Sequence, residues 1–85
     1  MSFQITDPVT QLCREMEALI EAAIEGASAQ VTGSGGHFEI TVTSAAFEGQ
    51  SRVNQQRMVY GPITALMSGP DAPVHAIDRM NLKTS

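Results

Sequence analysis

The sequence has a single cysteine, no long apolar run and no start typical of a secreted protein. Because Cys13 is the single cysteine, no disulfide can form within the chain, and nothing indicates an oxidising compartment. No apolar run approaches the roughly 18 residues that a membrane-spanning helix needs. The first residues, MSFQITDPVTQ, lack a basic start and an apolar core, unlike a signal peptide. We therefore expect a cytoplasmic protein that does not interact with a membrane.

Motifs for hydrolytic or acid–base catalysis are missing as well. The chain has no GxSxG and no HExxH sequence, and its candidate nucleophile and bases are one cysteine and two histidines. A chain of 85 residues is expected to form one domain with a small core, which rarely hosts a deep catalytic cleft. We therefore predict a single domain over residues 1–85 that is not an enzyme.

The charge of the chain is acidic, and it is distributed unevenly. The net charge of −4 argues against indiscriminate binding to phosphate backbones. Residues 1–26 hold five acidic side chains and one arginine, so this part of the chain carries the whole net charge of −4. Residues 27–85 have no net charge. A local basic patch in the second part of the chain therefore stays possible.

A first helix is predicted after Asp7, which is a good N-cap, and Pro8, which fits the first helical position. Gly26 is expected to end this helix. The apolar residues recur at steps of three and four and form one stripe, on which Cys13 is expected to be a buried small hydrophobe. The stripe consists of Val9, Leu12, Cys13, Met16, Leu19, Ile20, Ala23 and Ile24.

A hairpin follows the helix. Residues 29–32 form a weak strand, the run GSGG at 33–36 a flexible turn, and residues 37–43 a strong strand. In the second strand Phe38, Ile40 and Val42 alternate with polar residues, which predicts one face covered by helices and one face open to solvent. The GSGG run lacks the lysine and the following helix of a phosphate-binding loop.

The second half of the chain is predicted to hold two helices and a last strand. A polar, Gln-rich helix begins after Glu48-Gly49, breaks at Gly61-Pro62 and restarts as the short helix Ile63–Met67. A loop at 68–73 leads to a strand within residues 74–83, whose uneven alternation calls for a bulge or a late start. The result is an α+β domain with helices on one face of a three-stranded sheet.

Two kinds of binding site are compatible with these residues. His37 and His75 lie at strand edges, but two histidines cannot complete a metal site, so further ligands would have to come from another molecule. Arg52 and Arg57 flank amides that can contact phosphates and base edges, and a solvated helix face explains them equally well. The residues alone do not decide between these interpretations.

The middle of the chain resembles the BolA-like family. The similarity runs from His37 through HFEITVTSAAFEGQSRVNQQRMVYGPITAL to Leu66 and resumes at Val74-His75-Ala76-Ile77. The VYGP sequence at 59–62 is similar to that of the bacterial subgroup typified by IbaG. The family pattern is represented here by Phe47, Gly49, Ser51, Val53, Gln56, Arg57, Val59 and Tyr60.

The resemblance implies a class II KH-like fold, αββααβ, with a mixed three-stranded sheet. It also implies a partner, a monothiol glutaredoxin with glutathione, with which a [2Fe–2S] cluster is shared in iron–sulfur trafficking or iron sensing. His75 matches the family ligand at the start of the last strand, and His37 matches the ligand between the first two strands. No cofactor is expected in the isolated chain. Some relatives act as DNA-binding regulators, which would use the helix pair of residues 51–67 with Arg52, Arg57 and Lys83.

The last strand departs from the family pattern. The run HAIDRMNLKT is three residues longer than the usual motif, so a second alignment register is possible. That register matches Ile77–Thr84 to the motif and puts Asp78 where the histidine belongs. We favour His75 as the ligand and keep Asp78 as the alternative.

Overall fold

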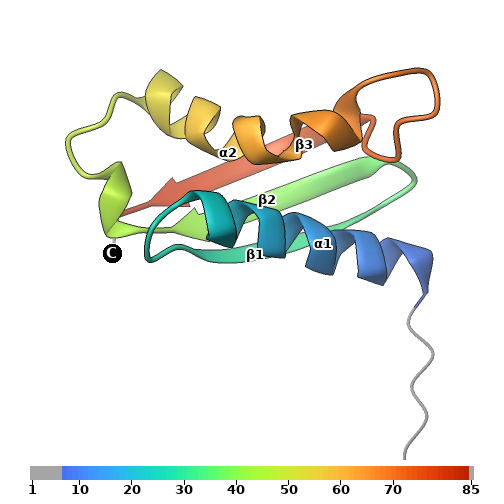
Figure 1. Ribbon diagram of the computed structural model, residues 1–85, viewed down its shortest axis with the longest axis horizontal. Coiled ribbons are helices and arrows are strands. Elements are labelled where there is room, and N and C mark those ends of the chain that lie inside the picture. Colours follow the sequence, from blue (N-terminus) through green and yellow to red (C-terminus); the bar gives the residue numbers. More distant parts are fainter. Residues whose placement is uncertain (1–6, 85) are drawn as a thin grey trace, which may run out of the picture.

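The computed structural model describes residues 7–84, which form two layers (Figure 1). Helix α1 and helix α2 lie side by side on one face of a sheet of three strands. The predicted α+β class, with helices on one face of a mixed sheet, is confirmed. In chain order the elements are α1 (Pro8–Ala23), β1 (Ser28–Ser34), β2 (His37–Thr43), the 3₁₀ helix η1 (Ala45–Phe47), α2 (Arg52–Met67) and β3 (Ala76–Lys83).

The sheet has the order β1-β2-β3, so β2 is central. Strands β1 and β2 form the predicted antiparallel hairpin, whereas β3 runs parallel to β2. The first strand is longer than predicted, because Gly33 and Ser34 pair with Phe38 and His37. Gly33 suits this position because a Cβ there would clash with the His37 carbonyl and with Phe38, whose ring atom Cδ1 would be 2.6 Å away.

The core lies between the sheet and the helices. Phe38, Ile40 and Val42 of β2 are buried, as their alternation predicts, and the intervening residues face the open side of the sheet. Helix α1 begins at the predicted N-cap Asp7, whose carboxylate accepts a hydrogen bond from the Thr10 amide at 2.8 Å. It buries Cys13, Met16 and Ile20, and it ends at Ala23, before Gly26 is reached.

Helix α2 is continuous, so the predicted break at Gly61-Pro62 is wrong. Pro62 removes one hydrogen bond, the one to the carbonyl of Met58 four residues earlier. The preceding residue is glycine, which has no Cβ to clash with the proline ring. Val59 and Ile63 on either side are fully buried, and such packing supplies most of the stability of a helix in a protein. Helix α2 therefore stays helical through a residue that would end an isolated helix.

Strand β3 contains the bulge that its uneven alternation predicts. Phe38 pairs with Ile77 and Glu39 pairs with Arg79, so Asp78 is the extra residue. The bulge lets Ile77, Met80 and Leu82 all pack against the core, although Ile77 has the opposite parity in sequence. None of the described helices is long and apolar enough to cross a membrane.

Side chains of α1 cover the outer edge of β1, which the sequence did not indicate. Glu17 Oε2 accepts a hydrogen bond from the Val31 amide at 2.8 Å, and Glu21 Oε2 accepts one from the Ala29 amide at 3.0 Å. Arg14 donates to the Val31 carbonyl at 3.3 Å and lies 3.1 Å from Glu17. These acids therefore satisfy an edge strand and are more than a solvated helix face.

Candidate functional site

Both histidines of the chain lie at one end of the sheet. His37 opens β2, and its register partner in the parallel strand β3 is Ala76, the residue after His75. The Gly36 carbonyl accepts hydrogen bonds from the amides of His75 at 2.8 Å and Ala76 at 3.0 Å. The two backbone segments that carry the imidazoles are thus joined directly, although 38 positions separate them in sequence (75 − 37). We call this end, formed by Gly36, His37, His75 and Asp78, the histidine rim.

The position of the His75 ring depends on a glycine. Gly36 has a φ of 82°, in the left-handed region that favours glycine. A Cβ at this position would lie 2.7 Å from both Cγ and Nδ1 of His75, closer than real atoms approach. The imidazole therefore packs in the space that a side chain at residue 36 would fill, and it remains exposed to solvent.

The His37 ring is held by a different residue. Its Nδ1 lies 3.1 Å from Oδ1 of Asp78, the bulged residue of β3. Both side chains are more than half exposed, at 58% for His37 and 56% for Asp78. The two sequence registers put either His75 or Asp78 at the family ligand position, and both residues lie at the rim. Among the described residues, the His37 ring is in hydrogen-bonding contact with Asp78 and not with His75.

The rim continues into the open face of the sheet. Glu39 and Arg79 are register partners two residues from His37, and their side chains approach to 3.6 Å. Both are largely exposed, and exposed pairs of this kind contribute about 0–1 kcal/mol. The pair therefore contributes little to the stability of the fold.

The donors at the rim make an incomplete ligand set. Within residues 7–84 no group of three or more His, Cys, Asp and Glu side chains is arranged to hold a metal ion. Two exposed imidazoles fit the nitrogen ligands of a mixed nitrogen and sulfur site, which holds some iron–sulfur clusters. Cys13 is not suited to be a ligand, because its side chain is buried, at 4% exposure, and burial raises the pKa of its thiol.

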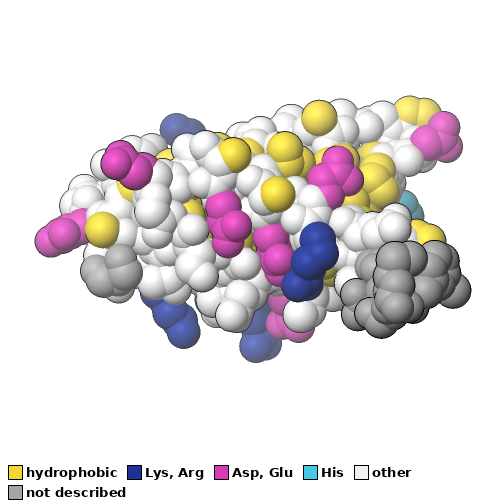
Figure 2. Space-filling view, turned by 60° about the horizontal axis from the view of Figure 1, so that its bottom comes forward, with side chains coloured by type: hydrophobic (Ala, Val, Ile, Leu, Met, Phe, Trp, Pro, Cys, Tyr) yellow, Lys and Arg dark blue, Asp and Glu magenta, His cyan; other side chains and the backbone are white. Residues whose placement is uncertain are grey.

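The basic residues singled out for nucleic acids lie elsewhere. Arg52 and Arg57 are exposed on α2, and Lys83 ends β3. The helix pair that was expected to present them does not form, because α2 is a single helix. Among the described residues on the face shown in Figure 2, basic side chains are separated by acidic and neutral ones. The structure thus removes the helix pair on which a DNA-reading interpretation depended.

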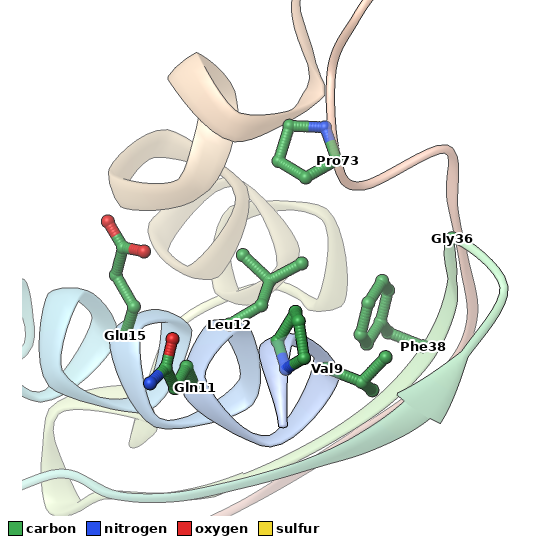
Figure 3. Close-up of a pocket in the computed structure, with 8 residues that line it drawn as sticks. Val9, Gln11, Leu12, Glu15, Gly36, Phe38 and Pro73 are labelled. Carbon is green, nitrogen blue, oxygen red and sulfur yellow. The ribbon is translucent and has the colours of Figure 1, made fainter. Parts of the chain in front are cut away.

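An apolar pocket lies beside the rim, under the loop before β3 (Figure 3). Its volume is about 340 Å³. Val9 and Leu12 of α1 turn toward Phe38 of the sheet, and Gly36 connects this pocket to the histidine rim. Of the residues that the structure describes, Glu15 is the one carboxylate in the lining, and no histidine, lysine or arginine lines the pocket beside it. The lining consists of Pro8, Val9, Gln11, Leu12, Glu15, Gly36, Phe38 and Pro73.

Comparison with known proteins gives the family. The family model described as "BolA-like protein" matches residues 16–85. The chain belongs to the BolA-like family. The predicted family is therefore confirmed, and the match includes the histidine rim.

Curated relatives of this BolA-like protein include the acid stress protein IbaG of Escherichia coli K12. The two are 32% identical over 63 residues, which is 74% of this chain and 73% of IbaG. The similarity agrees with the subgroup that the VYGP sequence indicated.

Solved structures of BolA proteins share the fold. A BolA homologue from Coxiella burnetii has a TM-score of 0.68 at 24% identity, covering 95% of this chain and 92% of that one. BolA1 from Arabidopsis thaliana has a TM-score of 0.70 at 22% identity, covering 85% and 89%. At these identities the comparison supports the architecture of the BolA-like chain and leaves its function to the site.

Proposed function

We propose that this BolA-like chain is a cytoplasmic partner of a monothiol glutaredoxin, with which it shares a [2Fe–2S] cluster as cargo. His37 and His75 are its ligands, and a glutaredoxin thiolate and glutathione complete the set. The role would be the trafficking of iron–sulfur clusters or the sensing of iron. IbaG is named an acid stress protein, and a contribution to stress response is compatible with this role.

One observation carries the ligand assignment, which is that both histidines of the chain lie at the same end of the sheet. The carbonyl of Gly36, the residue before His37, accepts hydrogen bonds from the amides of His75 and Ala76, and both imidazoles are exposed, so a second protein can reach them. The contact at Gly36 also supports the assignment, since the missing Cβ at residue 36 leaves room for the His75 imidazole on the rim.

The proposed ligand set has a chemical consequence. Neutral imidazoles in place of thiolates reduce the negative charge around a cluster and raise its reduction potential. Because this chain supplies two ligands and the partner supplies the others, a cluster would be held only while both proteins are associated. Its release would follow from separation of the complex, which suits a transfer or sensing role.

Reconstitution tests this proposal. The chain is mixed anaerobically with a monothiol glutaredoxin, iron, sulfide and glutathione, and the complex is isolated by size-exclusion chromatography. We expect a heterodimer with the visible absorption of a [2Fe–2S] cluster. His37→Ala and His75→Ala should each lower the cluster content of the heterodimer, whereas Arg57→Ala, an exposed change on α2, should not.

Two outcomes would contradict the proposal. A chain that never associates with the glutaredoxin would remove the partner. A heterodimer whose cluster absorption is unchanged in both histidine variants would remove the ligands and leave only the association.

A further inference from the structure

The contact between His37 and Asp78 can determine how the His37 ring is oriented. Of the two nitrogens of the His37 ring, Nδ1 is the one that faces the Asp78 carboxylate, at 3.1 Å from Oδ1. Two other side chains near this end have neighbours of their own, since Glu39 faces Arg79 and the His75 ring packs over Gly36. Asp78 is therefore the group that can orient the His37 ring.

The chemistry of the pair defines which nitrogen is left free. An ionised carboxylate can only accept hydrogen bonds, so the imidazole must donate from Nδ1. A neutral imidazole carries one N–H, and its other nitrogen then keeps a lone pair. With the proton on Nδ1, the lone pair of His37 is on Nε2, which points away from Asp78.

From this geometry we infer that Asp78 is a positioning residue, which holds His37 as the Nδ1–H tautomer and presents Nε2 as the ligating nitrogen. Ligating histidines in metal sites commonly donate their second N–H to a carboxylate, which fixes the ring and raises its basicity. The consequence for ligation rests on the proposed function, whereas the tautomer is a property of the chain alone.

The bulge in β3 makes this contact possible. Asp78 is the residue without a partner in the β2–β3 register, inserted between Ile77 and Arg79. The three-residue-longer run that departs from the family motif thus gives this chain a carboxylate beside its first histidine. His75, one residue before β3, keeps its own place over Gly36.

Side-chain nitrogen NMR on the isolated chain tests the inference. Long-range ¹H–¹⁵N spectra distinguish the two tautomers, and they are recorded at about pH 8.5, above the ordinary histidine range near 6.5. We expect His37 of the unmodified chain to be mainly Nδ1–H. In Asp78→Ala it should change to mainly Nε2–H, the form that free histidine favours, while the backbone spectrum shows that the fold is kept.

Two controls accompany the measurement. The tautomer of His75 should be the same in Asp78→Ala as in the unmodified chain, because its ring contacts Gly36. Glu39→Ala removes a carboxylate from the same face and should leave His37 as Nδ1–H. A His37 that is mainly Nε2–H in the unmodified chain, or mainly Nδ1–H in Asp78→Ala, would overturn the inference.

The reconstituted complex gives a second readout. Asp78→Ala should lower the affinity for the cluster about 10–100-fold, the usual effect of losing such a carboxylate. In a chain that also carries His37→Ala, the same change should have no further effect, because Asp78 acts through His37. Failure of the glutaredoxin to bind would contradict the proposed function and leave the tautomer result unaffected, so the two failures are distinguishable.

Discussion

At the scale of the residue, Ser44 shows how one buried polar side chain joins distant parts of the chain. It is fully buried, and its hydroxyl donates to the Glu25 carbonyl at 2.8 Å. The same oxygen accepts from the Ala46 amide at 3.0 Å and begins η1, while the Ser44 amide donates to Lys83 at 2.9 Å. One residue thus connects the turn after α1, the end of β3 and the start of η1.

Ser44→Ala is expected to destabilise the protein by about 1–3 kcal/mol, since a buried amide and carbonyl lose their partner. Urea denaturation gives the free energy of unfolding. Ser68→Ala is the matched control, because its exposed hydroxyl bonds the Thr64 carbonyl at the end of α2. Equal effects of the two substitutions would show that burial of Ser44 contributes nothing.

Gly36 is the residue on which the position of His75 depends. Gly36→Ala should destabilise the fold by more than about 1 kcal/mol, because it adds both backbone strain and a clash with the His75 ring. Gly35→Ala separates the two effects, since Gly35 has a φ of 61° with nothing within 4 Å of its Cβ position. Thermal denaturation measures stability, and the His75 ring resonances should move only in Gly36→Ala. Identical results for both variants would contradict the contact of His75 with Gly36.

Sequence reasoning at this scale found single residues and missed their pairing. The burial of Cys13 and the capping role of Asp7 follow from local pattern, and both are confirmed. The contact between His37 and Asp78 joins residues 41 apart and depends on the register of two strands, which no local pattern fixes. The uneven alternation of residues 74–83 indicated a bulge, but it did not indicate that the bulged residue would contact His37.

At the scale of the element, the edge of β1 is protected by α1. Exposed edge strands offer unpaired amides to other chains, and proteins cover them in several ways. Here the carboxylates of Glu17 and Glu21 take the place of a neighbouring strand. Glu17 is 15% exposed as a side chain, so its hydrogen bond is better shielded than those on the surface.

Glu17→Ala should expose the edge of β1. We expect a loss of about 1.5–3 kcal/mol, typical of a hydrogen bond to a charged group, and faster amide hydrogen exchange at Val31. Glu15→Ala removes the same charge from the same helix, and no hydrogen bond from Glu15 to β1 is found among the described residues. Protection of Val31 that falls equally in both variants would refute the edge role.

Helix α2 shows why the ends of a helix cannot always be predicted from the local sequence pattern. The rule that proline ends a helix is a statement about an isolated segment. Burial of Val59 and Ile63 against the sheet outweighs it, and that burial depends on the tertiary fold. The alternating strand β2 needed no such context, because its pattern already specifies which face is buried.

At the scale of the whole molecule, the parallel pairing of β2 and β3 brings together the backbone segments that carry the two histidines. A crossover through α2 returns the chain to the same end of the sheet, so the first residues of both strands meet there (Figure 1). The α+β class was predictable from the order of elements. The residues alone did not predict that both histidines lie at one end, because that depends on the strand order and the turn at Gly36; it was implied by the family resemblance, which matched His37 and His75 to ligands of one cluster.

The central claim is that histidine nitrogens of this chain ligate the shared cluster. It is tested most directly by pulsed EPR of the reduced complex, prepared from ¹⁵N-histidine-labelled chain and unlabelled glutaredoxin. The chain has two histidines, His37 and His75, so any coupling to ¹⁵N from this label reports on them. The account predicts strong ¹⁵N couplings that decrease in His75→Ala and in His37→Ala. A complex that holds its cluster without such couplings would contradict it.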